Sequence, residues 1–225
     1  MTALAAQASV AAVEWHKSVG LVPYPDAVAA MEARAARIAQ GHGGECVWLL
    51  EHPPLYTAGT SADFSELLEP GRLPVFRTGR GGRFTYHGPG QRVAYVMLDL
   101  TRRGRDLRAF VRSLEDWLIA TLGLLGVKGE RCPGQIGVFV DGAKVASIGV
   151  RLRRWVSLHG VSLNVAPDLE HFSGIVPCGL KNVSITSLDR LNAETDMSKI
   201  DAALFNTFVD IFGEARFSAN PFRAP

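Results

Sequence analysis

Cys178 and Lys144 are the two side chains whose types and settings best suit covalent chemistry. Cys178 stands between Pro177 and Gly179, which fixes the thiol on a bend. Lys144 follows the turn Asp141-Gly142-Ala143 and begins an apolar strand. A thiol attacks as the thiolate, and a neighbouring cation lowers its pKa from an ordinary value of about 8.5. The pattern therefore favours a nucleophilic Cys178 with Lys144 as its cation.

Each of these side chains also has an ordinary structural explanation. A lone cysteine is most often a small core residue, as Cys46 is expected to be within its apolar strand, while Cys132 precedes Pro133-Gly134 and is a second candidate thiol in an exposed turn. A lysine where a turn meets a strand is usually a solvated charge. The alternative partners for a thiol are His87, His159 and His171. The six histidines and three cysteines show no metal-ligand spacing, so the sequence predicts no metal site.

A glycine-rich segment, residues 80–91, carries the second candidate site. It reads Arg80-Gly81-Gly82-Arg83-Phe84-Thr85-Tyr86-His87-Gly88-Pro89-Gly90-Gln91. Its four glycines let the backbone approach a ligand closely and adopt positive φ angles. The glycine spacing matches neither a phosphate loop nor the dinucleotide fingerprint. A binding loop and a hairpin that merely needs turns are both compatible with the pattern.

Helical and strand-like patterns alternate along the chain and must position these residues. Apolar residues at helical spacing predict three helices, residues 25–40, 107–125 and 197–212. Apolar runs predict strands over residues 46–50, 93–98, 136–140 and 144–152, and two short strands, 155–158 and 161–165, around His159-Gly160. Asp141-Gly142 predicts a tight hairpin turn. The mixture lacks regular βαβ alternation, so we expect an α+β fold with a mixed, largely antiparallel sheet flanked by helices.

Length and composition set the remaining limits. The 225 residues are 47% apolar and carry a net charge of +2, which predicts one domain over residues 1–225 and gives no sign of nucleic acid. Residues 1–13 are alanine-rich, lack a secretory or mitochondrial pattern, and are expected to form an N-terminal extension. The apolar runs are too short to cross a bilayer, so no membrane association is expected. Three widely spaced cysteines are typical of reduced thiols in a cytoplasmic protein.

Four blocks of sequence together resemble the octanoyltransferases of lipoate biosynthesis. They are the glycine-rich segment above, Lys144-Val145-Ala146-Ser147-Ile148-Gly149-Val150, His159-Gly160-Val161-Ser162-Leu163-Asn164 and Pro177-Cys178-Gly179. Glu51-His52-Pro53 and Tyr56-Thr57-Ala58-Gly59 also look like the N-terminal part of that family. The blocks occur in the family's order, and the resemblance spans residues 22–212.

The resemblance implies a fold, a reaction and a set of partners. Such enzymes share the fold of biotin- and lipoate-protein ligases, need no cofactor, and transfer an octanoyl group from octanoyl-acyl carrier protein. The acceptors are lysines on lipoyl domains of 2-oxoacid dehydrogenase complexes and the glycine cleavage protein. The chain is expected to act as a monomer, with neither nucleic acid nor membrane as a partner.

The resemblance also assigns roles to residues. Cys178 becomes the acyl-thioester nucleophile and Lys144 the residue that lowers its pKa. The implied substrate-binding residues are Arg80, Gly81, Gly82, Arg83, Phe84, Thr85, Tyr86, His87, Ser147, Ile148, Gly149, Gly160, Val161 and Ser162.

The sequence is compatible with two other functions. An ATP-dependent lipoate- or biotin-protein ligase would share the fold without needing Cys178, and a noncatalytic relative would only bind lipoylated or acylated domains.

Ten arginines and two acidic residues occupy residues 71–112, a local excess of positive charge that would steer an acidic carrier protein. We expect Arg102, Arg103 and Arg105 to form the docking face; Arg151, Arg153 and Arg154 form a second basic cluster.

Overall fold

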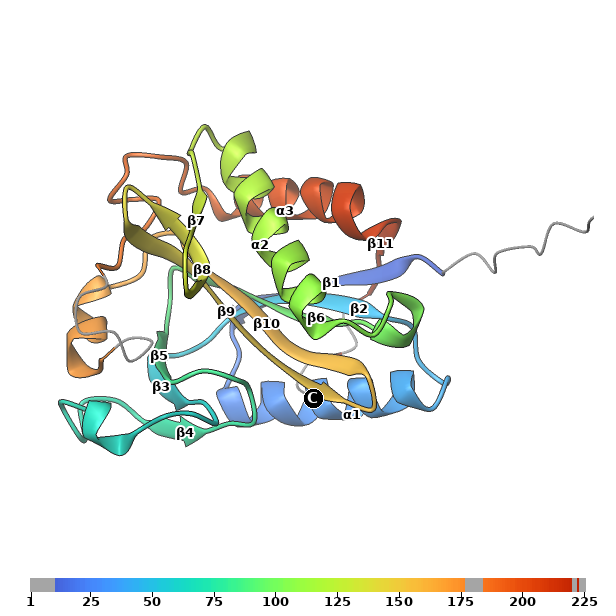
Figure 1. Cartoon of the computed structure of the whole chain (residues 1–225), viewed down its shortest axis with the longest axis horizontal. Coiled ribbons are helices and arrows are strands. Elements are labelled where there is room, and N and C mark those ends of the chain that lie inside the picture. Colours follow the sequence, from blue (N-terminus) through green and yellow to red (C-terminus); the bar gives the residue numbers. More distant parts are fainter. Residues whose placement is uncertain (1–10, 177–183, 220–221, 223–225) are drawn as a thin grey trace, which may run out of the picture.

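An eight-stranded sheet organises the computed structural model, which describes residues 11–176, 184–219 and 222. Its strand order is β11-β1-β2-β6-β10-β9-β8-β7, and a smaller sheet has the order β4-β3-β5 (Figure 1). The large sheet comprises β1 (Val13–Leu21), β2 (Cys46–Glu51), β6 (Gln91–Met97), β7 (Glu130–Cys132), β8 (Gln135–Val140), β9 (Ala143–Arg153), β10 (Val156–Asn164) and β11 (Ala215–Phe217). The small sheet comprises β3 (Leu55–Ala58), β4 (Val75–Arg77) and β5 (Phe84–His87).

Three helices cover the large sheet. In Figure 1, α1 (Tyr24–Ala39) lies on one face, while α2 (Leu107–Leu124) and α3 (Met197–Phe212) lie on the other. One apolar core fills the space beneath α2 and α3, and a second lies beneath α1. Asp106 and Asp196 cap α2 and α3 by accepting backbone N–H groups of the first turn, which explains where both helices begin.

The expected fold class is confirmed. β1 pairs in parallel with β2 and β11, and the other pairs of the large sheet are antiparallel. Asp141 and Gly142 have φ angles of 49° and 77°, as a two-residue hairpin turn requires. All three predicted helices are present, and no end differs from the prediction by more than one residue.

Two predictions need correction. Residues 155–158 and 161–165 do not form separate strands, because the residues between them stay in register with β9, where His159 pairs with Val150 and Gly160 with Gly149. Val13, which we assigned to an N-terminal extension, is the buried first residue of β1 and pairs with β11. The assignment of residues 1–225 to one domain stays a prediction.

Candidate active site

A cavity of about 510 Å³ gathers most of the residues that the sequence singled out. Lys144 lines it, together with thirteen of the fourteen expected substrate-binding residues. These thirteen are Arg80, Gly81, Gly82, Arg83, Phe84, Thr85, His87, Ser147, Ile148, Gly149, Gly160, Val161 and Ser162. One wall is thus the glycine-rich segment and the other is the β9–β10 pair. The volume lies within the range of pockets that hold small ligands.

Glycine is required where these walls meet the rest of the sheet. Gly160 lies on β10 beside β6, and a Cβ there would overlap the carbonyl oxygen of Ala94. A Cβ on Gly149 would stand 2.8 Å from Cδ of Arg80. The two glycines pair with each other across β9 and β10, so the cavity wall is backbone at this point.

Tyr86 is the one expected binding residue that does not line the cavity. Its side chain is buried in the core of the small sheet, with its ring centroid 5.3 Å from that of Phe172 and 6.3 Å from that of Tyr56. Successive side chains of a strand point to opposite faces, so Tyr86 turns away from Thr85 and His87, which do line the cavity.

Lys144 is buried, with 2% of its surface exposed, which excludes the alternative of a solvated charge. Its Nζ donates to the carbonyl oxygen of Ile136 at 3.0 Å and lies 5.2 Å from the ring centroid of Phe139. Its backbone is fixed as well, since its N–H donates to Ser184 and its carbonyl accepts from Thr186. The structure therefore presents this amine to the cavity from a rigid strand.

The expected nucleophile, Cys178, and its neighbour Gly179 lie outside the described residues. The other two thiols are placed. Cys46 is fully buried in β2, and burial raises the pKa of its thiol to about 12, so it is the core residue that the sequence predicted. Cys132 ends β7 and is half-buried. Neither thiol lines the cavity.

Histidines bring no positive charge to this site. Burial is the main cause that lowers the pKa of both His87 and His159 to about 3, and the nearby Arg80 guanidinium adds to the effect. His171 lies outside the cavity lining, with Nε2 3.5 Å from a carboxylate oxygen of Asp168. A neutral imidazole does not stabilise a thiolate by its charge, so the lysine is favoured over the alternative partners.

Arg80 holds the glycine-rich segment against the small sheet. Its guanidinium donates to the carbonyl oxygen and hydroxyl of Thr57, at 2.9 and 2.7 Å, and to the carbonyl oxygens of Gly81 and Arg83. These bonds link Gly81 and Arg83 of the glycine-rich segment to Thr57 of β3. The side chain that the sequence assigned to substrate therefore also builds the cavity wall.

The sequence missed several lining residues. Tyr24 and Tyr95 contribute phenol groups, and burial raises the pKa of both. Leu107 and Val111 of α2 and Ile136 of β8 add an apolar wall. A tyrosine inside an otherwise apolar run was the available signal for Tyr95, whereas the wall residues come together only through tertiary packing.

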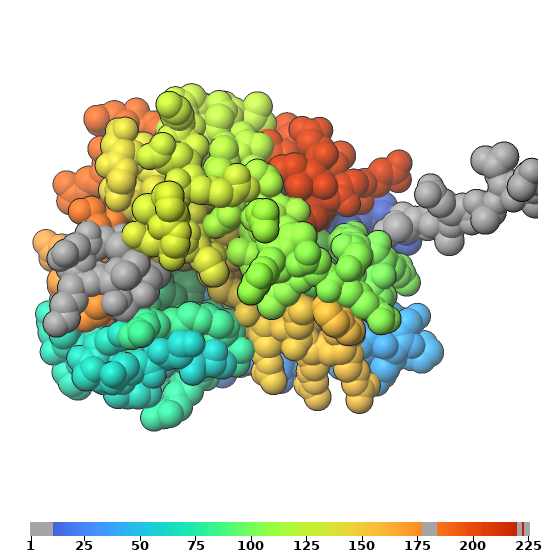
Figure 2. Space-filling view, in the orientation of Figure 1, coloured from blue at the N-terminus to red at the C-terminus, as the bar shows by residue number. Residues whose placement is uncertain are grey.

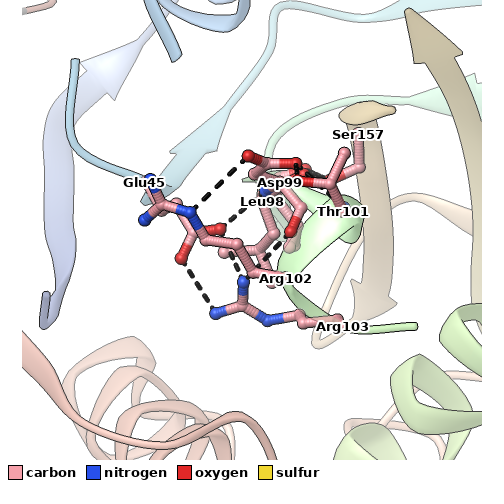
Figure 3. A network of polar contacts seen from close by, with 8 residues as sticks. Glu45, Leu98, Asp99, Thr101, Arg102, Arg103 and Ser157 are labelled. Carbon is pink, nitrogen blue, oxygen red and sulfur yellow. Dashed lines mark hydrogen bonds and ion pairs between the residues drawn. The ribbon is translucent and has the colours of Figure 1, made fainter. Parts of the chain in front are cut away.

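The expected docking arginines are partly engaged within the chain itself. Arg103 donates to both carboxylate oxygens of Glu45, at 2.5 and 2.9 Å, and Arg102 lies 3.6 Å from a carboxylate oxygen of Asp99 (Figure 3). The guanidinium of Arg105 lies 5.9 Å from the ring centroid of Trp155. Arg103 thus anchors the segment before α2 to Glu45, the residue that precedes β2, and this carboxylate compensates its charge.

Neither a metal-binding cluster nor a membrane-spanning helix is found among the described residues. Among them, no three His, Cys, Asp or Glu side chains are grouped so that they could hold a metal ion. In the same part of the chain, no helix has the length and apolar character needed to cross a membrane.

The fold is that of the lipoate-protein ligases. A lipoate-protein ligase A solved with bound ATP superimposes with a TM-score of 0.75 at 14% identity, covering 92% of this chain and 89% of that one. A putative lipoate protein ligase from Thermoplasma acidophilum, solved with lipoic acid, gives a TM-score of 0.70 at 15% identity, with 93% and 89% coverage. At such identities the likeness concerns the fold alone.

Sequence comparison defines the family more closely. Residues 23–209 match the model of the lipoyl protein ligase A/B catalytic domain, and the chain belongs to that family. An octanoyltransferase of Rhizorhabdus wittichii is 59% identical over 210 residues, covering 92% of this chain and 94% of the relative. An octanoyltransferase of Caulobacter vibrioides is 58% identical, with 94% and 97% coverage.

Proposed function

We propose that this chain, an octanoyltransferase of lipoate biosynthesis as its relatives indicate, works through an octanoyl thioester on Cys178. The observation that carries the proposal is the position of Lys144. A buried amine lines the same cavity as the glycine-rich segment and the β9–β10 wall, where an acyl thioester needs both a hydrophobic site and a cation. The enzyme class is acyltransferase.

The first half of the proposed reaction is a thioester exchange. The Cys178 thiolate attacks the carbonyl carbon of octanoyl-acyl carrier protein and a tetrahedral oxyanion forms. The bond from the carbonyl carbon to the carrier sulfur then breaks, and the carrier leaves as a thiolate that takes up a proton. Lys144 stabilises the attacking thiolate by its charge. One thioester replaces another, so no nucleotide is needed to drive the step.

The second half forms an amide. The neutral ε-amine of a lysine on a lipoyl domain attacks the enzyme thioester, and the bond to the Cys178 sulfur breaks. The sulfur leaves as the Cys178 thiolate, and the amine nitrogen loses one proton, which passes to that thiolate or to solvent. Lys144 is positioned to relay that proton. Backbone N–H groups of residues 147–149 and of Gly179 are our candidates for holding the oxyanion, and Gly179 lies outside the described residues.

The donor, the acceptors and the setting complete the proposal. The donor is octanoyl-acyl carrier protein, and the acceptors are lipoyl domains of 2-oxoacid dehydrogenase complexes and of the glycine cleavage protein. The enzyme acts as a monomer in the cytoplasm. The cavity supports an apolar acyl substrate, because Leu107, Val111, Ile136 and Val161 contribute aliphatic surface to its lining.

Intact-mass spectrometry tests the covalent step. Incubation with octanoyl-acyl carrier protein should add about 126 Da, the mass of an octanoyl group replacing one hydrogen, and peptide mapping should place it on Cys178. Cys178→Ser should abolish the adduct. Cys132→Ser is the matched control, a second thiol outside the cavity, and should label like the unmodified enzyme.

Transfer to an isolated lipoyl domain tests Lys144. We expect Lys144→Met to lower kcat by about 10²- to 10⁴-fold, the usual contribution of a positioned acid–base group. Activity that survives in both Cys178→Ser and Lys144→Met, or that requires ATP, would refute the proposal and favour the ligase. Absence of any adduct or transfer would favour a noncatalytic binder.

A further inference from the structure

One peptide group lies between a buried carboxylate and the amine of Lys144. The N–H of Gly137 donates to Oε1 of Glu115 at 3.2 Å, and the carbonyl oxygen of Ile136 accepts from Nζ of Lys144 at 3.0 Å. These two groups belong to the same peptide unit. Helix α2, strand β8 and strand β9 are thereby joined through a single line of hydrogen bonds that ends in the cavity.

Glu115 occupies a position that packing alone does not explain. It lies on the buried side of α2 beside Leu114 and Leu118, and only 5% of its surface is exposed. Its second oxygen accepts from Nε of Arg131 at 2.8 Å, so both oxygens have partners. Burying a carboxylate costs desolvation free energy, and pairing with an arginine often does no more than offset that cost. Glu115 is therefore not expected to add much to stability, and we expect it to have another role.

Gly137 fixes the geometry of the bridging peptide. Its φ of 128° is a conformation that side chains rarely adopt. A Cβ at this position would lie 2.7 Å from the carbonyl oxygen of Ala146, and 3.2 and 3.4 Å from Cε and Nζ of Lys144. The peptide and the lysine side chain are therefore in direct contact, and a displacement of one displaces the other.

We propose that Glu115 is the positioning residue of Lys144, acting through the Ile136–Gly137 peptide. The carboxylate aligns and polarises the peptide so that its carbonyl oxygen faces the amine, because hydrogen bonds in series strengthen one another in a buried setting. This inference rests on the proposed role of Lys144 in acyl transfer and extends it to a residue outside the cavity lining.

The surrounding charges define which variants are informative. Arg131 pairs with Glu115 on the side away from the peptide, and Asp116 accepts from the same guanidinium at 2.7 Å. Arg80 is a second cation that lines the cavity. The side chain of Asp116 is 55% exposed and makes no contact with Gly137 that the structure records, which makes Asp116→Asn the matched control for charge removal on α2.

Steady-state kinetics of four variants test the inference. Glu115→Ala, which removes the acceptor, should lower kcat for octanoyl transfer about 10- to 100-fold with little change in KM for the acyl donor. Glu115→Gln keeps an oxygen acceptor for the Gly137 N–H and should restore much of kcat. Asp116→Asn should match the unmodified enzyme in both kcat and KM. Lys144→Met serves as the reference for loss of the amine itself.

The outcomes separate this inference from the proposed function. If Lys144→Met loses activity while Glu115→Ala and Glu115→Gln keep the kcat of the unmodified enzyme, the inference is wrong and the function stands. If Lys144→Met keeps full activity, the role of Lys144 on which this inference rests fails, while Cys178→Ser tests the thioester separately. Amide hydrogen exchange of Gly137 gives a reading even where a variant is unstable, since exchange should accelerate in Glu115→Ala and not in Asp116→Asn. Unchanged exchange in Glu115→Ala would also overturn the inference.

Discussion

Three buried histidines contribute polar, uncharged side chains to the cavity and its surroundings. His52 is fully buried, with Nδ1 2.7 Å from the carbonyl oxygen of Val22 and Nε2 3.0 Å from the hydroxyl of Tyr95. Nδ1 of His87 lies 2.7 Å from Oε1 of Gln91. Burial lowers the pKa of His52 to about 4, and those of His87 and His159 to about 3. These rings act as fixed dipoles at neutral pH.

Stability should therefore fall in mild acid. Between pH 6.5 and the lowered pKa values, about 4 for His52 and about 3 for His87 and His159, the unfolded chain binds a proton on each of these histidines and the folded chain does not. The free energy of unfolding then decreases as the pH falls through this window, by up to roughly 1.4 kcal/mol per pH unit for each ring. His87→Asn should make the slope shallower by about one proton, measured by urea unfolding from pH 7 to pH 4. A slope that does not change in His87→Asn would contradict this account.

The residue types in the sequence indicated which residues form the site better than they indicated how those residues are buried and hydrogen-bonded. The glycine-rich segment stood out by its residue types, whereas the residues of the β9–β10 wall were assigned only through the resemblance to the octanoyltransferases, and Lys144 was at first one possible cation among several. The burial of Lys144 was not predictable, since it depends on the carbonyl oxygen of Ile136 and on strand β8, which pairs with β9 in the same sheet. Glu115 gave no local signal, because one carboxylate on an amphipathic helix is ordinary until its depth is known.

At the scale of elements, a buried ion pair ties α3 to the sheet. Nε of Arg92 on β6 lies 2.8 Å from Oδ1 of Asp201 on α3, and both side chains are buried. Lys17 of β1 reaches the other carboxylate oxygen at 3.2 Å, with its side chain half exposed. The pair ties α3 to β6, the strand that pairs with β10 of the cavity wall.

Breaking this pair should cost more than removing it. Arg92→Met leaves a buried carboxylate and should lower the free energy of unfolding by about 3 kcal/mol. The double variant Arg92→Met/Asp201→Leu should recover most of that loss, because no uncompensated charge stays buried. Lys17→Met, at the exposed edge, should cost at most about 1 kcal/mol. Chemical denaturation measures all three, and a double variant as unstable as Arg92→Met would contradict the prediction.

Long elements with strong periodicity were predictable, whereas short or non-local strands were not. The helices and the β8–β9 hairpin follow from local pattern and turn chemistry. β11 has three residues and pairs in parallel with β1, about two hundred positions earlier, so no local pattern specifies it. β10 was split in the prediction at His159-Gly160, yet His159 keeps its pairing despite a φ of 59°. Tertiary pairing overrode the local signal there.

At the scale of the molecule, the arginines divide into engaged and exposed sets. Arg92 and Arg103 are committed to Asp201 and Glu45, as described above. Arg108 and Arg112 are exposed on α2, one helical turn apart and next to the cavity residues Leu107 and Val111. In Figure 2 the start of α2 lies beside the β9–β10 hairpin, whose tip carries the exposed Arg153 and Arg154. Exposed basic charge thus lies on the first turns of α2, next to cavity residues in sequence, and on the tip of the neighbouring hairpin, in addition to Arg102 and Arg105, which are exposed as well.

The exposed arginines of α2 predict which charge reversals weaken binding of an acidic acyl donor. Arg108→Glu and Arg112→Glu should each raise KM for octanoyl-acyl carrier protein by about three- to tenfold with little change in kcat, because charges at the rim of an interface act mainly on association. The effect should shrink as salt is raised from about 0.05 to 0.5 M, where the screening length falls below about 10 Å. Lys128→Glu, an exposed reversal just beyond the far end of α2, is the control and should leave KM unchanged. Steady-state transfer to a lipoyl domain measures all three, and an equal rise in KM for Lys128→Glu would mean that net charge, rather than this surface, governs donor binding.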